Sequence, residues 1–198
     1  MAILIKSDLE AASSDGSPAI SALIADKEDA QQLKNSIESF ISGSSSELKG
    51  DAYDRVRSHM SEYLNVLESR IKTADSVMEA IKSANKKLIA YMEDEDKLDS
   101  SELESYQNKA TIAQNTIDSL NRMINNYDPD KANVSKDYLY GQLSAQEANL
   151  AKYKKMVRLL EGLEGADSSA YGELSSSAEF VTSLTTTVGG MQNIKIKS

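Results

Sequence analysis

The sequence predicts an all-α protein, an elongated antiparallel hairpin or bundle of about five helices of which the second is very long. Two observations lead to this prediction. Apolar residues recur at alternating spacings of three and four in successive segments, and no segment has the apolar–polar alternation of a strand. With two Phe, two Pro and no Trp in 198 residues, the composition suits long solvated helices rather than a compact globule.

The first long helix is expected to begin at Ser17-Pro18 and to end near residue 42. Ser17 supplies a capping hydroxyl and Pro18 a preset φ at the first helical position, whereas Gly43-Ser44-Ser45-Ser46 is expected to break the helix. Before it, residues 1–15 open with a short apolar run and then turn polar, and we expect these fifteen residues to form a β-like or irregular arm on the bundle. The apolar seam of this helix, with one acidic exception, is Ala19, Leu23, Asp26, Ala30, Leu33, Ile37 and Phe40.

The second helix is expected over about residues 51–92, which corresponds to on the order of 60 Å at about 1.5 Å per residue. Asp51 can cap this helix, and Asp54 lies in its first turn, where the helix dipole favours a carboxylate. The expected seam departs from apolar residues only at Arg70. Its members are Val56, Met60, Tyr63, Leu67, Arg70, Ala74, Val77, Ile81, Ala84, Leu88 and Tyr91.

A second apolar stripe runs beside this seam and consists of Leu64, Ile71, Met78 and Met92, with the polar Asn85 between them. The two stripes together are wider than one neighbouring helix covers, and the first helix, about 40 Å long, is too short to cover them throughout. We therefore expect the four apolar residues of the second stripe to bind partner helices. The alternative is that later helices of the chain fold back and cover this stripe.

The acidic run Glu93-Asp94-Glu95-Asp96 is expected to end the second helix, because carboxylates are unfavourable at a helix C-terminus. We place the domain boundary here, with a helical hairpin over 1–97 and a C-terminal helical part over 98–198 that packs along the hairpin or extends it. Ser101 with Glu104 has the form of a capping box, and Asp128-Pro129-Asp130 ends the helix that follows.

Three more seams follow this boundary. The third is Leu103, Tyr106, Ala110, Ala113, Ile117, Leu120, Ile124 and Tyr127; the fourth is Leu139, Leu143, Gln146, Leu150, Tyr153, Val157 and Leu160; the weaker fifth is Ala170, Leu174, Ser177, Val181, Leu184, Val188 and Met191.

Charge and composition exclude several classes of partner. The net charge of −9 argues against nucleic acid, because nucleic-acid binders concentrate Lys and Arg on one face. The absence of cysteine excludes disulfides and thiolate metal sites and fits either redox compartment. The N-terminus lacks the basic segment and apolar run of a Sec signal. Residues 180–194, the least charged stretch, are too short and too rich in Thr and Gly to span a bilayer, so we expect no membrane insertion.

Catalytic residues in a recognisable arrangement are absent from the sequence. His59 is the one imidazole, and beside Met60 on the long helix it is expected to be an ordinary surface histidine rather than a base or a metal ligand. The sequence contains none of the short motifs of zinc proteases, α/β-hydrolases or phosphate-binding loops. Paired carboxylates such as Glu102 with Glu104, and the run 93–96, are expected to be solvated charge or caps. We therefore expect no enzyme, no cofactor and no metal.

The tripeptide Leu48-Lys49-Gly50 lies between the two longest helical patterns and is expected to form the tip of their hairpin. Gly50 can adopt positive φ, and Leu48 can close the end of the hairpin. The run Leu48-Lys49-Gly50-Asp51-Ala52-Tyr53, together with the opening Ile5-Lys6-Ser7-Asp8-Leu9, resembles the LXG domain, the N-terminal targeting region of toxins secreted by the type VII system of Gram-positive bacteria. Smaller Trp-X-Gly secretion substrates have the same hairpin layout, although Leu48 stands here where those proteins have Trp.

This resemblance implies a targeting or adaptor role rather than catalysis. The implied partners are one or two small Trp-X-Gly-like helical proteins and the secretion ATPase, and the implied location is the cytoplasm before export by a Sec-independent route. A toxin domain would normally follow the C-terminus, so the chain is expected to be an excised fragment or a stand-alone substrate. Tyr91 and Glu95 fit the Tyr-X-X-X-Asp/Glu export pattern, and at i and i+4 they are expected to share a helix face, although a small partner often carries this signal and Tyr91 also completes the seam.

Two other functions are compatible with the same residues. The first is a generic coiled-coil scaffold or adaptor that contains Leu48-Lys49-Gly50 by chance and is unrelated to secretion. The second is a helical membrane-active protein, which is disfavoured because no segment can span a bilayer and no face is markedly basic.

Overall fold

The computed structural model describes residues 2–172, which are almost entirely helical, so the predicted all-α fold class is confirmed. Contacts divide these residues into two compact units, one formed by residues 2–6 with Tyr91–Asp167 and the other by Ser7–Ala90 with residues 168–172. The domain boundary expected at residue 97 stays a prediction, because contact density alone does not define a domain. Residues 163–172 are helical, and the predicted fifth seam lies outside the described residues from Leu174 onward.

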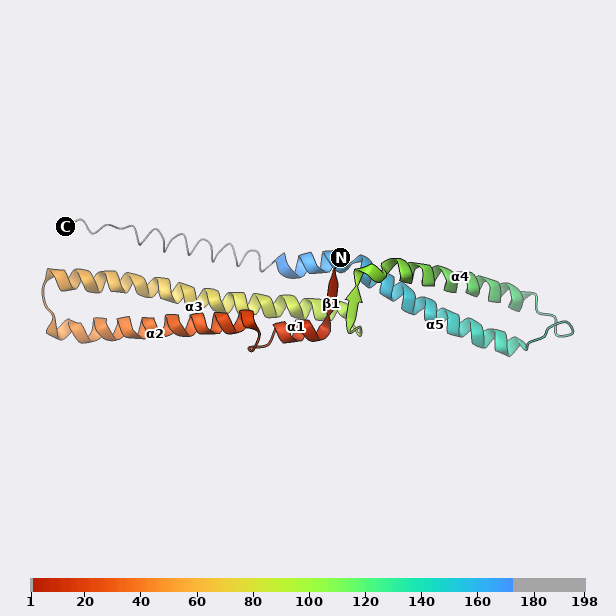
Figure 1. Ribbon diagram of the computed structural model, residues 1–198, viewed down its shortest axis with the longest axis horizontal. Coiled ribbons are helices and arrows are strands. Elements are labelled where there is room, and N and C mark those ends of the chain that lie inside the picture. The colour runs from red at the N-terminus through yellow and green to blue at the C-terminus, as the bar shows by residue number, and fades with distance from the viewer. Residues whose placement is uncertain (1, 173–198) are drawn as a thin grey trace. The chain divides into compact units, whose positions relative to one another are not determined.

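The larger unit is built on a helical hairpin. The short helix α1 (Lys6–Ala12) is followed by α2 (Pro18–Glu47) and by the longest helix, α3 (Asp51–Met92) (Figure 1). Lys27 pairs with Asp75 at 2.6 Å and Lys34 with Glu68 at 2.7 Å. The later residue of α2 thus pairs with the earlier residue of α3, so the two helices are antiparallel and the predicted antiparallel hairpin is confirmed.

The start of α2 follows the sequence prediction, and its end does not. The Ser17 hydroxyl accepts a hydrogen bond from the Ile20 amide at 3.4 Å, and Pro18 is the first helical residue. The prediction that Gly43 and the serines after it break the helix is wrong, because α2 continues to Glu47. The Ser45 hydroxyl donates to the Ser42 carbonyl oxygen at 2.8 Å. Serine hydroxyls that bond back to the preceding turn in this way can remain inside a helix.

The buried side of α2 includes only every second residue of the predicted seam. At the positions between, the less exposed residue is the one that follows the predicted residue in the sequence. Leu33 and Phe40 were expected in the seam but are 53% and 38% exposed. The less exposed row contains Lys27 and Lys34, whose ammonium groups reach carboxylates of α3, so polar residues occupy positions that the apolar pattern assigned to their neighbours. This row is Ile20, Leu23, Lys27, Ala30, Lys34, Ile37, Ile41, Ser44 and Leu48.

The buried side of α3 is displaced in the same manner over the first half of the helix. Val56 and Tyr63, expected in the seam, are 43% and 50% exposed. The second stripe takes their place: Leu64, Ile71 and Met78 are half-buried, and Met92 is fully buried. The less exposed row of α3 is thus Met60, Leu64, Leu67, Ile71, Ala74, Met78, Ile81, Asn85, Leu88 and Met92. In the second half of the helix the predicted seam is covered as well, because Val77 and Tyr91 are half-buried and Ala84 is fully buried.

The smaller unit pairs two short strands with a second helical hairpin. Strand β1 (Ile3–Ile5) runs antiparallel to β2 (Lys97–Asp99), with Leu4 opposite Leu98. The β-like arm expected over residues 1–15 is therefore present at residues 3–5, and the expectation is wrong for residues 6–12, which form the helix α1. A 3-10 turn, η1 (Ser100–Glu102), leads into α4 (Leu103–Asn125), and α5 (Lys136–Glu161) returns beside it. All members of the predicted third and fourth seams are buried or half-buried.

Two polar residues fix the starts of these elements. Ser101 lies in η1 rather than at a helix cap, so the predicted capping box with Glu104 is wrong. Asp99 takes the capping role, because its carboxylate accepts from the Ser101 amide at 3.0 Å and from the Ser101 hydroxyl at 2.6 Å. Ser135 caps α5 by accepting from the Tyr138 amide at 3.1 Å. Helix α4 ends before Asp128-Pro129-Asp130, as predicted.

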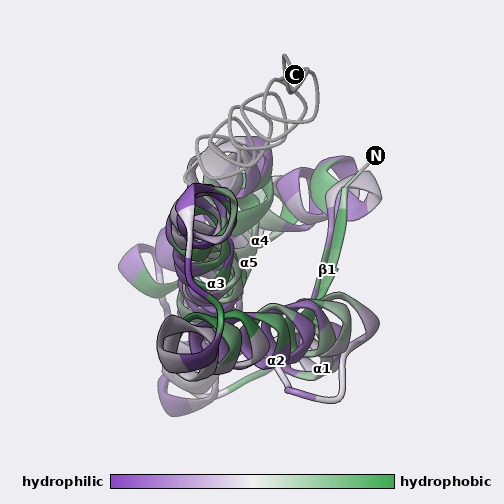
Figure 2. Ribbon diagram, turned by 90° about the vertical axis from the view of Figure 1, so that its left-hand side faces the viewer, coloured by the Kyte–Doolittle hydropathy of each residue, from purple (hydrophilic) through white to green (hydrophobic). Residues whose placement is uncertain are grey.

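Polar residues are distributed along every long helix of the structure. Figure 2, which looks along α2 and α3, shows hydrophilic and hydrophobic residues on both helices. Among residues 2–172, no helix combines the length and the apolar character needed to cross a membrane.

Candidate functional site

The Leu48-Lys49-Gly50 turn forms the tip between α2 and α3. Gly50 has φ of 120°, the left-handed region that favours glycine, as the sequence predicted. A Cβ atom at Gly50 would meet no atom within 4 Å, so the backbone angle rather than lack of space requires glycine. Lys49 and Gly50 are exposed, and Leu48 is half-buried in an extended conformation. The turn therefore presents Lys49 and Gly50 to solvent with Leu48 tucked against the hairpin.

The backbone of Gly50 caps the start of α3. Its carbonyl oxygen accepts from the Tyr53 amide at 3.0 Å and from the Asp54 amide at 3.1 Å. Asp51 is already the first helical residue, so the prediction that Asp51 is the cap is wrong. Asp51 and Asp54 both lie in the first turn, where the positive end of the helix dipole stabilises carboxylates.

Arg57 is a residue of this tip that the sequence analysis missed. Its Nη1 donates to the carbonyl oxygens of Leu48 at 2.9 Å and of Ser44 at 3.2 Å, and its Nη2 pairs with the Asp54 carboxylate. The side chain is only 14% exposed. One feature of the sequence could have indicated such a residue. The last turn of α2 contains no basic residue, so the unpaired carbonyl groups at the end of this helix favour a cation from another part of the chain.

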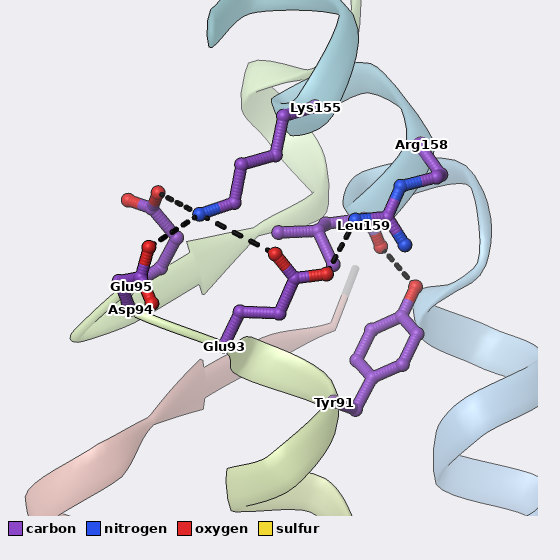
Figure 3. A network of polar contacts seen from close by, with 7 residues as sticks. All are labelled: Tyr91, Glu93, Asp94, Glu95, Lys155, Arg158 and Leu159. Atoms are coloured by element: carbon purple, nitrogen blue, oxygen red, sulfur yellow. Dashed lines mark hydrogen bonds and ion pairs between the residues drawn. The ribbon is translucent and has the colours of Figure 1, made fainter.

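A second polar cluster surrounds the end of α3, where residues 93–95 form a turn that we call the acidic turn (Figure 3). The helix ends at Met92 as predicted, and Glu93 adopts φ of 55°. Lys155 of α5 lies 3.5 Å from the Glu93 carboxylate and 3.2 Å from those of Asp94 and Glu95. Arg158, one turn further along α5, also pairs with Glu93.

The run is expected to be solvated charge or caps; Asp94 is indeed 93% exposed, but all three carboxylates of the turn are ion-paired, and these pairs change the titration of Glu93 and Lys155. The hydrogen bond from Arg158 lowers the pKa of Glu93 below its usual value. Hydrogen bonds to Asp94 and Glu95 raise the pKa of Lys155. The turn and α5 are therefore joined by charge-assisted hydrogen bonds.

The predicted export motif lies in the same cluster. The Tyr91 hydroxyl donates to the Leu159 carbonyl oxygen at 2.5 Å, and burial raises the pKa of Tyr91. Glu95 follows the end of the helix, so the prediction that Tyr91 and Glu95 share a helix face is wrong. The structure nevertheless brings both side chains onto α5, because Glu95 pairs with Lys155.

Comparison with protein families decides the class of the chain. The model of the LXG domain of the WXG superfamily matches residues 13–196, a span that includes the tip and the acidic turn. The chain belongs to the LXG domain family. At the level of the family this implies secretion-related targeting of toxins, and the superfamily is associated with Sec-independent secretion. A comparison with curated proteins and one with solved structures found no match.

The hairpin of this LXG domain carries exposed apolar side chains on one side. Arg70 and Asp26 join α3 to α2, with Arg70 Nε 2.9 Å from the Asp26 carboxylate. Positions seven residues apart return to the same side of a helix in a coiled coil. Leu33 and Phe40 lie seven and fourteen residues after Asp26, and Tyr63 and Val56 lie seven and fourteen residues before Arg70. These four exposed residues, which we call the apolar row, therefore share one side: Leu33, Phe40, Val56 and Tyr63.

The four residues predicted to bind partners lie elsewhere. Leu64, Ile71 and Met78 are half-buried on the seam of α3, and Met92 is fully buried in the other unit. Partner binding at these positions stays a prediction, and the structure leaves less of their surface free than it leaves on the apolar row.

In the part of the LXG domain that the structure describes, the potential metal-ligating side chains do not gather into a metal site. Among residues 2–172, no group of three or more His, Asp or Glu residues could hold a metal ion. His59 is 59% exposed, with Nδ1 3.6 Å from the Glu62 carboxylate, a surface position like the one predicted. An open groove of about 730 Å³ lies beside the α4–α5 loop and is lined by residues such as Arg122, Tyr127 and Lys131. The expectation that the chain is not an enzyme stays a prediction.

Proposed function

We propose that this LXG domain is a non-enzymatic targeting domain that binds small helical partner proteins and directs an attached toxin to the type VII secretion system. The observation that carries the proposal is membership of the LXG family over residues 13–196. The geometry of the tip supports it, because the Leu-Lys-Gly turn is held in a defined shape and exposes Lys49 and Gly50. Recognition by the secretion ATPase and export by a Sec-independent route complete the proposed pathway.

The apolar row supports the partner-binding part of the proposal. Leu33 is 53% exposed and Tyr63 is 50% exposed, and each lies seven residues from the Asp26–Arg70 pair that joins the two helices. Exposed apolar surface on a helical hairpin favours association with another amphipathic helix, and each Å² buried contributes about 25 cal/mol. A small helical hairpin of the Trp-X-Gly type is a partner of suitable shape, because it can lay one apolar stripe along the apolar row.

The partner-binding part is tested by co-expressing the full chain with the small helical proteins encoded by adjacent genes. We expect Leu33→Glu with Tyr63→Glu to reduce co-purification of these proteins at least tenfold while leaving the melting temperature unchanged. The matched control is Ile112→Glu with Met123→Glu, which alters two exposed apolar residues of α4 that are 65% and 49% exposed. Equal loss in both double variants would contradict specific docking on the row.

Export is tested separately at the tip. We expect Leu48→Asp with Gly50→Glu to abolish secretion of an attached toxin while helicity stays close to that of the wild type and the melting temperature falls only slightly, because a side chain is strained at the positive φ of Gly50. A drop in the melting temperature together with lost helicity would instead assign the tip a purely structural role. A generic coiled-coil scaffold, the competing function, predicts that neither double variant changes export.

A further inference from the structure

Arg57 contacts the backbone at two places near the tip, the last turn of α2 and the turn that follows it. It projects from the second turn of α3, yet its guanidinium donates to Ser44 at the end of α2 and to Leu48 in the turn itself. Asp54, one turn before it on α3, neutralises its second nitrogen. The planar guanidinium can hold several acceptors at fixed angles, which a single ammonium cannot do.

The carbonyl groups that Arg57 binds have few other donors available. The last carbonyls of a helix lack partners inside the helix, and the negative end of the dipole lies there. Helix α2 has no basic residue in its last turn, and the Ser44 carbonyl also accepts from the Leu48 amide at 3.0 Å. Arg57 is thus the cation that balances the end of α2.

The conformation of the turn depends on these contacts. Leu48 has φ of −108° and ψ of 104°, so the chain leaves α2 at this residue. Gly50 supplies the positive φ that returns it to α3, but glycine by itself permits many conformations. The bond from Arg57 to the Leu48 carbonyl fixes the direction in which the peptide between Leu48 and Lys49 points.

We infer that Arg57 is the positioning residue of the Leu-Lys-Gly turn: it sets the conformation in which Leu48, Lys49 and Gly50 are presented for recognition. The recognition part of this inference rests on the proposed function. Arg57 acts through the backbone and not by touching a partner, because its side chain is only 14% exposed.

The test compares three variants of the full chain: Arg57→Gln, Arg57→Lys and, as the matched control, Arg55→Gln on the same turn of α3. The first readout is hydrogen exchange at the Leu48, Tyr53 and Asp54 amides, which bond to Ser44 and Gly50. We expect exchange to accelerate on the order of tenfold in Arg57→Gln, less in Arg57→Lys and not at all in the control. Unchanged exchange in Arg57→Gln would overturn the inference.

The second readout is co-purification with the small helical proteins encoded by adjacent genes. We expect Arg57→Gln to weaken capture about as much as Leu48→Asp does, with partial recovery in Arg57→Lys. If Leu48→Asp loses capture and Arg57→Gln keeps it, positioning is refuted while the proposed function stands. If the wild type captures none of these proteins, the proposed function fails, and hydrogen exchange alone decides whether Arg57 shapes the turn.

Discussion

Gly162, at the end of α5, leaves room for the Tyr91 hydroxyl, and replacing it with alanine should perturb the acidic-turn cluster. Gly162 has φ of −83° and ψ of −5°, an ordinary helical conformation that alanine also adopts. A Cβ atom there would overlap the Tyr91 hydroxyl oxygen and lie 3.4 Å from the Arg158 carbonyl oxygen. Since the hydroxyl is bonded to the Leu159 carbonyl, Gly162→Ala must displace it from its acceptor.

Two opposing effects set the size of this change. Breaking the hydrogen bond and leaving a partly buried acceptor unpaired costs about 2 kcal/mol. Replacing glycine by alanine at a helical φ stabilises the fold by about 0.4–1 kcal/mol through the unfolded state. We therefore expect Gly162→Ala to lower the free energy of unfolding by roughly 1–2 kcal/mol.

The background Tyr91→Phe should reverse the sign. Phenylalanine has no hydroxyl to collide, and the ring carbon that remains would lie 3.4 Å from the new Cβ, an ordinary contact. In this background Gly162→Ala should therefore stabilise the fold by about 0.4–1 kcal/mol. The coupling between the two positions is then on the order of 2 kcal/mol.

Urea unfolding of the four proteins in this cycle, with hydrogen exchange of residues 155–163, measures the coupling. Gly141→Ala is the control, because a Cβ there meets no atom within 4 Å, and it should only stabilise. If Gly162→Ala has the same effect in both backgrounds, the reasoning about the hydroxyl is refuted.

Three further outcomes are expected. The hydrogen bond from the Ser101 hydroxyl is the main reason that the pKa of Asp99 is lowered from 3.8 to about 2. The stability that the Asp99 carboxylate contributes is therefore complete above about pH 4 and is lost as the pH falls towards 2. Exchange of the Ser101 amide should accelerate over that interval, and Asp99→Asn should remove this pH dependence. Leu67→Ala should lower the free energy of unfolding by about 2–4 kcal/mol because Leu67 is only 6% exposed. Leu33→Ser should change it by about 0.5 kcal/mol or less, because Leu33 is exposed. Urea titrations measure both, and equal losses would disprove the burial of α2 and α3 described here. Ser17→Ala should cost about 1 kcal/mol in the same titrations through loss of the α2 cap, and Ser17→Asn should retain most of it.

The α4–α5 hairpin could be predicted almost completely from the sequence, and the α2–α3 hairpin only in outline. In α4 and α5 nearly every seam position is apolar, so the residues that recur at helical spacing in the sequence are the residues that the structure buries. In α2 the seam includes Lys27 and Lys34, which bind Asp75 and Glu68. The apolar pattern therefore pointed to Leu33 instead of its neighbour Lys34. As a result, the side of α2 that was expected to be buried is not the side that packs on α3.

The polar clusters depended on contacts between distant parts of the chain. Lys155 follows the acidic turn by about sixty residues, and no local pattern links it to Asp94. Arg57 is closer to the end of α2, but its role becomes visible only when the hairpin closes. The end of α2 was missed for a local reason, because the sequence rules treat serine as a helix breaker while Ser45 bonds back into its own helix.

The pairing of β1 with β2 has a consequence for how the chain acquires its structure. Leu4 is the partner of Leu98, so the first strand is synthesised long before its neighbour exists. On the ribosome, α2 and α3 can form their hairpin while β1 is still without a partner. Ordering the N-terminal strand has an entropic cost, and only three paired residues on each side offset it. The N-terminal strand should therefore be among the last elements to become ordered during synthesis and among the first to detach when the chain is pulled from its N-terminus.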